Sequence, residues 1–439
     1  MSRPPIPAPP VLIPRRTALL GLGAAWTLGS ASLALARPSG PARRDGRLVV
    51  VILRGALDGM AAVIPYGDPA LAALRAPLVP PPPGQPGGMR DLGGFYGLHP
   101  ALPVLHGFYA QGSLLPIHAV AGHYRSRSHF EAQDYMESGA DTRLTSGWLN
   151  RAVGAMGGLP YGPDGAGLSV GLSTPLLLRG PTPIGGFDPL QAARPDDDLF
   201  ARIAALNAPD PLTGPALRAG LRADTYSIRA LSARERADAA SSGMTAPGAL
   251  HPGVPYPGVP YPGAPRPGTA RPDPFLVLCH TAGTLLAAPD GPRVAALEIG
   301  GWDTHAAQMG RLSGPLRRLD AGLGALRDAL GPAWAHGAVL VMTEFGRTVR
   351  INGTAGTDHG TGTITLLAGG AVAGGRVGGT WPGLARGQLF ENRDLAPTTD
   401  LRAVAMGVLR DHMDVPAHAM PRIFPGSAGI APLAGLIRA

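Results

Sequence analysis

The chain has 439 residues and a formal net charge of +8, from 38 basic and 30 acidic residues. The basic residues form no run and no aromatic-spaced stripe, which excludes a nucleic-acid-binding protein. The single cysteine, Cys279, excludes an intrachain disulfide and a thiolate metal cluster. A hydrophobic core must therefore stabilise the fold.

The first 36 residues have the order of an export signal. Arg3, Arg15 and Arg16 precede an apolar run, rich in glycine and alanine, that ends in Ala34-Leu-Ala36. The adjacent Arg15-Arg16 pair indicates a twin-arginine signal, and the small-x-small ending predicts cleavage after Ala36. We expect the twin-arginine translocase to export the folded chain 37–439 to the periplasm or the medium. A retained membrane anchor is the alternative, but glycine and serine interrupt a run that is short for a membrane span.

Short apolar runs alternate with helical patterns along the mature chain. Runs without alternation, at residues 48–53, 114–120, 294–299, 338–342 and 363–367, are typical of strands buried on both faces. Residues 128–138 and 306–330 lie between such runs and have helical patterns. This order predicts an α/β domain whose mainly parallel sheet is covered by helices on both sides. We interpret the Pro/Gly-rich stretch at about 244–274 as an insertion within this one domain, and a linker between two domains as the alternative.

Acidic and histidine side chains follow four of the predicted strands. In chain order they are Asp58, then Ser128-His129, then Asp303 and His305, then Glu344 and Arg347, with Asp358-His359 shortly after. Parallel strands end at one edge of a sheet, and ligands of open α/β sheets bind at that edge. Carboxylates brought together there would repel one another unless cations neutralised them. Carboxylates together with imidazoles suit zinc, manganese or iron. We expect bound divalent ions, zinc, manganese or calcium, and two of them would neutralise the carboxylates.

The same strand ends contain five strings that are specific in combination. They are Leu53-Arg-Gly-Ala-Leu-Asp-Gly-Met60, Arg127-Ser-His-Phe-Glu-Ala-Gln-Asp134, Gly301-Trp-Asp-Thr-His305, Thr343-Glu-Phe-Gly-Arg-Thr348 and Thr357-Asp-His-Gly360. Together they resemble the bacterial domain-of-unknown-function family 1501, over roughly residues 48–425. That family is grouped with the alkaline phosphatase, sulfatase and cofactor-independent phosphoglycerate mutase superfamily. The resemblance therefore implies a three-layer α/β/α sandwich of the alkaline phosphatase-like type.

The resemblance also implies roles for individual residues. The implied metal ligands are Asp58, Asp303, His305, Asp358 and His359, with Glu344 competing with Asp358 for the same role. Ser128, at a helix start, matches the covalent nucleophile, and Arg347 or Arg127 would clamp a phosphate or sulfate oxygen through two parallel donors. The implied activity is that of a metal-dependent hydrolase or transferase. Its substrate would be a phosphate or sulfate ester of an anionic small molecule or a glycan.

Three observations favour other interpretations. Neither Cys279 nor Ser128 has the Pro and Arg, two and four residues later, of a formylglycine sulfatase. Phosphatases of this superfamily bind metal through a further histidine that follows the Asp-His pair. The only later histidines in this chain are His412 and His418, in a predicted terminal helix and loop, so the set of metal ligands is one histidine short. A catalytically silent periplasmic binding or scaffold protein is therefore the alternative function. Ser128 also begins a capping-box pattern with Glu131, which explains this serine without any chemistry.

Overall fold

The computed structural model describes residues 45–156, 166–190, 197–211, 213–214, 217, 226–234, 236–237 and 273–438. The predicted signal peptide, residues 1–36, lies outside the described residues. The same holds for the predicted insertion, except for its last two residues. Cleavage after Ala36 and the character of the insertion therefore stay predictions. Within the described ranges, no helix has the length and apolar character needed to cross a membrane.

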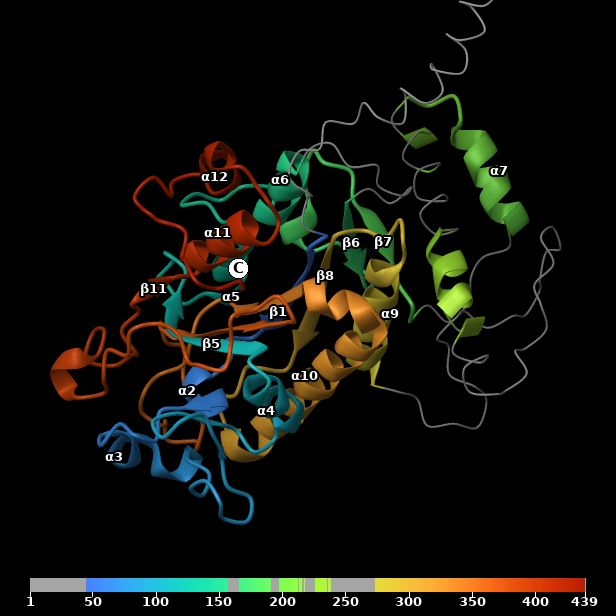
Figure 1. The fold of residues 1–439 in the computed structure, drawn as a ribbon. Helices are drawn as coiled ribbons and strands as arrows, with labels where there is room; N and C mark the ends of the chain where they lie inside the picture. The colour runs from blue at the N-terminus through green and yellow to red at the C-terminus, as the bar shows by residue number, and fades with distance from the viewer. Residues whose placement is uncertain are drawn as a thin grey trace, which may run out of the picture. The chain divides into compact units, whose positions relative to one another are not determined.

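An eight-stranded sheet organises the described part of the chain (Figure 1). Its strand order is β11-β5-β10-β9-β1-β8-β6-β7. The bounds are β1 Arg47–Arg54, β5 Leu114–Ala121, β6 Gly167–Val170, β7 Gly185–Phe187, β8 Val294–Gly300, β9 Gly337–Thr343, β10 Thr363–Ala368 and β11 Thr399–Asp400. Neighbouring strands pair in parallel, except that β10 is antiparallel to both β5 and β9. The predicted mainly parallel sheet is confirmed, with β10 as its one reversal among these strands.

The central strand β1 shows why the sheet is covered on both sides. Its residues alternate between two hydrophobic clusters: Val49, Val51 and Leu53 belong to one, and Leu48, Val50 and Ile52 belong to the other. All six are at most 1% exposed. An uninterrupted apolar run is expected for a strand that has a core on each face.

Helices pack against both of these faces (Figure 1). On one side lie α4 Pro103–Ala110, α9 Pro274–Ala287 and α10 Gln308–Leu330, and on the other lie α5 His129–Ser138, α6 Trp148–Ala155, α11 Leu401–Asp411 and α12 Met420–Ile423. The further helices are α2 Gly59–Ala62, α3 Leu71–Arg75 and α7 Asp197–Asn207, and the 3-10 helices are η1 Ala76–Leu78, η2 Leu176–Leu178, η3 Gly331–His336, η4 Arg386–Gln388 and η5 Ala417–Ala419. A small second sheet has the order β2-β4-β3, with β2 Val63–Ile64, β3 Arg90–Asp91 and β4 Gly97–Leu98.

The direction of the strands brings the predicted site segments to one edge. The parallel strands β1, β5, β8 and β9 all end there, and each is followed by one of the segments with acidic or histidine residues. Because β10 runs opposite to β9, the connection between them, residues 344–362, begins and ends at this same edge. The segments that contain the candidate residues therefore meet in space.

Candidate metal centre

Three histidines and one aspartate converge at the carboxyl edge of the sheet. His129 is the first residue of α5, Asp303 and His305 follow β8, and His359 lies in the connection between β9 and β10. Ligand atoms of His129, Asp303 and His359 all lie within 4.8 Å of one another. His305 Nε2 lies 3.1 Å from Asp303 Oδ1 and 2.9 Å from His359 Nε2. We call these four residues the histidine cluster.

A hydrogen bond at Nδ1 fixes the orientation of each imidazole in the cluster. His129 Nδ1 lies 2.8 Å from Glu344 Oε1, His305 Nδ1 lies 3.1 Å from Asp358 Oδ1, and His359 Nδ1 lies 2.9 Å from the carbonyl oxygen of Arg127. Ionised carboxylates and carbonyl oxygens only accept hydrogen bonds, so each Nδ1 must donate. In the neutral ring, each Nε2 then has a free lone pair, which is the arrangement that metal-binding histidines adopt.

The Nε2 atoms of the three imidazoles face the Asp303 carboxylate. Their distances to the nearest Asp303 oxygen are 3.8 Å for His129, 3.1 Å for His305 and 3.9 Å for His359. His129 Nε2 is also buried, and it has no hydrogen-bond partner among the residues that the structure describes. An orphaned buried nitrogen together with three neighbouring ligand atoms fits a bound cation, since buried polar atoms otherwise find a partner.

Arg347 holds Asp303 and does not face outward as a clamp. Its guanidinium group is buried, and Nη2 donates to Asp303 Oδ1 at 2.6 Å and to the Gly55 carbonyl at 2.6 Å. Nε and Nη1 donate to the carbonyls of Ala56 and Thr357. Partial burial would raise the pKa of Asp303, but the hydrogen bond and charge of Arg347 outweigh burial and lower it. The geometry replaces the predicted phosphate or sulfate clamp with a positioning role for Arg347.

Glu344 and Asp358 each accept a hydrogen bond from one histidine of the cluster. The buried Glu344 carboxylate accepts hydrogen bonds from His129, Gln133, Thr343 and the Gly55 amide. Burial opposes its ionisation, but these hydrogen bonds outweigh burial and lower its pKa. Asp358 is half exposed, and the hydrogen bond from Asn352 is the main cause of its lowered pKa. Glu344 orients the His129 imidazole and Asp358 orients the His305 imidazole. The two carboxylates were predicted to compete for one ligand position, but in the structure they contact different histidines.

Asp58 is not part of the histidine cluster. Its side chain is fully buried and accepts from the Ala61 amide, which makes it the N-cap of α2. Oδ2 forms a buried ion pair with Arg75 and accepts from Gln308 Nε2 at 2.5 Å. Hydrogen-bond donors surround the Asp58 oxygens. In the structure Asp58 therefore holds neighbouring segments together, whereas the family resemblance implied a metal ligand.

Gln308 joins Asp58 to the loops of the cluster. Its Oε1 accepts from Thr304 Oγ1 at 2.9 Å and from Thr357 Oγ1 at 2.6 Å. Thr304 lies between Asp303 and His305, and Thr357 precedes Asp358. One buried amide therefore fixes the two loops relative to each other, and Asp58 acts on the site only through it.

Ser128 and Arg127 lie just before α5. Ser128 is the N-cap residue, but its side chain makes no capping hydrogen bond, and Glu131 instead accepts from Tyr124. Within the described ranges, the Ser128 hydroxyl has no hydrogen bond to a base. Arg127 pairs with Asp394 and Glu391, and its left-handed backbone, with φ of 58°, directs its carbonyl to His359. The capping box proposed from the sequence is not formed.

Sequence analysis did not assign His129 as a metal ligand, and it missed Arg75 and Gln308, which contact Asp58. His129 directly follows Ser128, and the string that contains both had been interpreted through its serine. Its position after a strand and at a helix start was the signal that could have identified it. Arg75 and Gln308 have no such signal, because only the fold brings them to Asp58.

Comparisons with known proteins bear on the family only. Residues 216–424 match the model of a family described as "Protein of unknown function (DUF1501)". The matched segment contains Asp303, His305 and the whole β9–β10 connection, but it begins after Asp58 and α5. It supports the resemblance drawn from the sequence strings over a narrower range than residues 48–425. No curated protein and no solved structure matches the chain.

Proposed function

We propose, for a chain whose residues 216–424 match this family of unknown function, that the histidine cluster binds a divalent transition-metal ion used in ester hydrolysis. The observation that carries the proposal is the convergence of three oriented Nε2 atoms on one carboxylate. His305 Nε2 and His359 Nε2 are only 2.9 Å apart, and two facing lone pairs repel each other unless a proton or a metal cation lies between them. Nitrogen ligands bind zinc at about 2.0–2.1 Å, so two of them on one ion lie roughly 3 Å apart.

The donor set narrows the choice of ion. Three imidazoles and one carboxylate suit zinc or manganese, whereas calcium prefers a larger shell of oxygen ligands. Calcium is therefore the least compatible of the three ions expected from the sequence. The third imidazole comes from His129, so the cluster does not depend on the late histidines, His412 and His418.

The reaction class rests on the bound ion and on the family resemblance together. A divalent ion would supply Lewis-acid chemistry, by polarising an ester oxygen and stabilising the charge that develops on it. The chain's own part is to keep Asp303 ionised through Arg347 and to orient the imidazoles through Glu344, Asp358 and the Arg127 carbonyl. We propose phosphate or sulfate esters as substrates, because the resemblance points to the alkaline phosphatase-like superfamily and fold. Since the Ser128 hydroxyl has no hydrogen bond to a base among the described residues, we propose water as the acceptor of the transferred group.

A binding protein without turnover is the second candidate. Asp303 and His305 have side chains that are 49% and 45% exposed, so the cluster is open to solvent. Two cavities, one between α5 and α11 and one near Arg90, do not include Asp303, His305 or His359 in their linings. A metal site with solvent-exposed ligands is compatible with a structural or ligand-binding ion.

Export is part of the proposal. We propose that the twin-arginine translocase carries the folded chain to the periplasm, where it acts without a membrane anchor. Because that route carries folded proteins, the ion could be bound before export. Replacing Arg15 and Arg16 by lysine should leave the chain in the cytoplasm, as cell fractionation would measure; unchanged export would contradict the proposal.

The test combines metal analysis with turnover. The chain should bind close to one equivalent of zinc or manganese, and Asp303→Ala should weaken binding by about 100-fold, because it removes one of four ligands. The control is Asp328→Ala, which removes an exposed partner of Arg327 and should leave metal binding unchanged. Turnover on a panel of aryl phosphates and sulfates should follow metal content across the variants. Failure to bind either ion would contradict the metal centre, whereas binding without turnover would favour the second candidate.

A further inference from the structure

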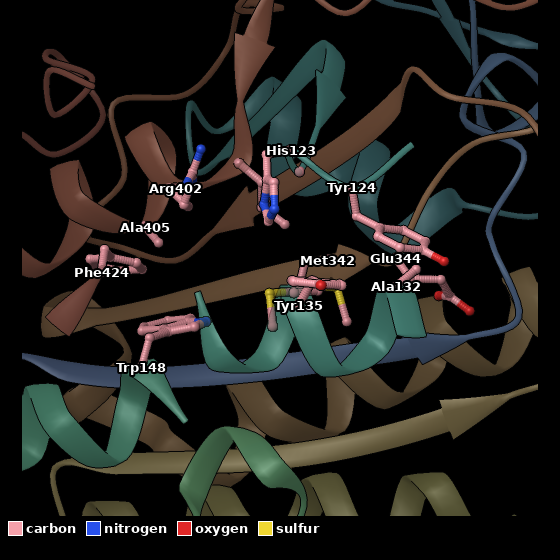
Figure 2. Close-up of a pocket in the computed structure, with 13 residues that line it drawn as sticks. His123, Tyr124, Ala132, Tyr135, Trp148, Met342, Glu344, Arg402, Ala405 and Phe424 are labelled. Atoms are coloured by element: carbon pink, nitrogen blue, oxygen red, sulfur yellow. The ribbon is translucent and has the colours of Figure 1, made fainter. Parts of the chain in front are cut away.

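Of two cavities outside the histidine cluster, the one near Arg90 has room for a small-molecule ligand. The cavity between α5 and α11 (Figure 2) has a volume of about 20 Å³, which holds one water, since a water needs roughly 10–15 Å³. The other is an open cleft of about 560 Å³, within the range of roughly 300–1,000 Å³ that is typical of small-molecule sites. Residues 83–85 and 87–91, Pro100 and His106 line it, and we call it the Arg90 cleft.

Hydrogen bonds hold the walls of the Arg90 cleft in place. The Met89 amide donates to the Pro81 carbonyl at 2.9 Å, which closes the Pro/Gly-rich segment into a loop. Arg90 and Asp91 form β3, which pairs with β4. His106 of α4 has its Nε2 atom 3.1 Å from the Asp91 carbonyl oxygen, and because a carbonyl only accepts, Nε2 donates and ties α4 to β3. The cleft is therefore preformed, as small-molecule sites usually are.

Arg90 brings a guanidinium group with unused donors to this cleft. Its Nε atom donates to the carbonyl oxygen of Pro100 at 3.3 Å, which fixes the group beside the cleft wall. Among the described residues, Nη1 and Nη2 make no hydrogen bond, and Arg90 forms no ion pair. Since neither nitrogen is buried without a partner, both are accessible from solvent. An anion with two suitably spaced oxygens accepts from both terminal nitrogens in parallel.

Two carboxylates near Arg90 have other hydrogen-bond partners. Asp91 follows Arg90 in β3, and successive side chains of a strand point to opposite faces. The Asp91 carboxylate accepts from the Tyr66 hydroxyl at 2.7 Å and from the Gly94 amide at 3.0 Å. The buried Asp320 carboxylate accepts from two amides at the start of α4; burial raises its pKa, against the opposing effects of these amides and of the Arg90 charge. The terminal nitrogens of Arg90 therefore remain available to an anion.

We propose that the Arg90 cleft binds a small molecule through a carboxylate or phosphate group, held by Nη1 and Nη2 of Arg90. Both groups present two oxygens at the spacing of the guanidinium nitrogens. Pro83 and Pro100 supply apolar surface for the rest of the ligand, and the glycines of the loop leave space beside it. None of the lining residues belongs to the histidine cluster, so this site does not depend on the metal ion or on the proposed function.

Isothermal titration calorimetry on the full chain, freed of metal with a chelator, tests this site. Phosphate and acetate are titrated separately, with chloride as the only other anion, so that the two arms identify which oxyanion binds. At least one of them should bind saturably. Arg90→Gln should weaken that binding at least about tenfold, because it removes the charge and the paired donors. Arg90→Lys keeps the charge without the planar fork, and its affinity should be intermediate.

The matched control is Arg376→Gln. Arg376 also donates to a single backbone carbonyl, that of Gly435, but it does not line the cleft. Its replacement should leave the affinity for phosphate and acetate at the wild-type value. The melting temperature of each variant shows whether it folds. If Arg90→Gln does not fold, Arg90→Lys decides, because an unchanged affinity in this variant would show that the guanidinium fork is not used.

The outcomes separate this inference from the metal centre. Saturable binding by the metal-free chain, weakened in Arg90→Gln and kept in Arg376→Gln, supports the cleft whether or not the chain binds metal or has turnover. Binding that appears only after zinc is added would place the anion on the ion and overturn the proposal. Absence of binding for both anions, or equal affinity in wild type and Arg90→Gln, would overturn it as well.

Discussion

Asp58 and Asp303 are two aspartates in the same kind of position with opposite surroundings. Each follows a parallel strand of the sheet and ends near the same edge. Asp58 is fully buried and pairs with Arg75 and Gln308, whereas the Asp303 side chain is 49% exposed and faces three imidazoles. Position after a strand therefore does not decide the role of a carboxylate. The partners decide it: hydrogen-bond donors fill the oxygens of Asp58, and nitrogen lone pairs gather around Asp303.

The largest loss of stability is expected when Asp58, the buried aspartate, is replaced. Asp58→Ala leaves Arg75 buried without its partner, and breaking such a pair lowers the free energy of unfolding by about 3–5 kcal/mol. Urea unfolding of the metal-free chain measures it. Asp134→Ala, which removes a surface partner of Arg143, should change stability by less than about 1 kcal/mol. Equal effects of the two substitutions would remove the distinction between buried and exposed pairs.

Histidine side chains also differ in burial, and the buried ones predict that the stability of the chain depends on pH. Burial lowers the pKa of His99 and of His118 to about 4. As pH falls, the unfolded chain binds protons near pH 6.5, before the folded chain does. Stability should therefore be lost between about pH 6.5 and 4, by roughly 3 kcal/mol for each histidine.

Urea unfolding of the metal-free chain at several pH values tests this dependence. His118→Gln should reduce the loss of stability across the window, because one of the two buried imidazoles is gone. A free energy of unfolding that stays constant from pH 7 to pH 4.5 would contradict the prediction.

Gln308 connects Asp58 to the loops that hold Asp303 and His359. Its removal should mainly affect the exposed aspartate, Asp303. Gln308→Met deletes the acceptor shared by Thr304 and Thr357, so the loops that hold Asp303 and His359 lose their common anchor. Metal affinity, measured by competition with a chelator, should fall by about tenfold. Asn150→Ala is a control with a buried amide elsewhere, bonded to Leu178 and Thr182, and it should lower stability but not metal affinity. Equal losses of metal affinity would show that Gln308 stabilises the fold without positioning the site.

The smallest effect is expected at Ser128. Among the described residues, its hydroxyl has no hydrogen bond to a base, and it makes no capping hydrogen bond. Ser128→Ala should therefore change turnover by no more than about twofold and stability by no more than about 0.5 kcal/mol. Steady-state kinetics on the substrates that the wild-type chain hydrolyses would measure this. A loss of 100-fold or more, with metal content unchanged, would restore Ser128 as the nucleophile.

Local patterns were sufficient for much of the fold and for part of the site. Residues 48–53 and 294–299 are long apolar runs, and they form β1 and β8 as predicted. The strands β6, β7 and β11 have only two to four residues, too few for a periodic pattern. The direction of β10 and the pairing of Asp58 with Arg75 depend on partners distant in sequence, which no local pattern specifies.

The site residues divide in the same way. Asp303, His305 and His359 were predicted because they follow strands, and the structure brings them together. The roles of Glu344, Arg347 and Asp358 as supports depend on which atoms they face, and the order of residues does not contain that information.

The reversal of β10 has a consequence for how the site could be assembled and altered. A parallel strand would require a long crossover to the far edge, whereas the β9–β10 connection turns back where it began. Glu344, Arg347, Asp358 and His359 therefore lie on one short stretch of chain whose ends are held by a paired ladder. Closing such a loop restricts little chain entropy, so this part of the site can form as soon as the two strands pair. The same stretch could be exchanged as a unit, altering one of the four donors, His359, and the three residues that support the donors, while every strand of the sheet stays in place.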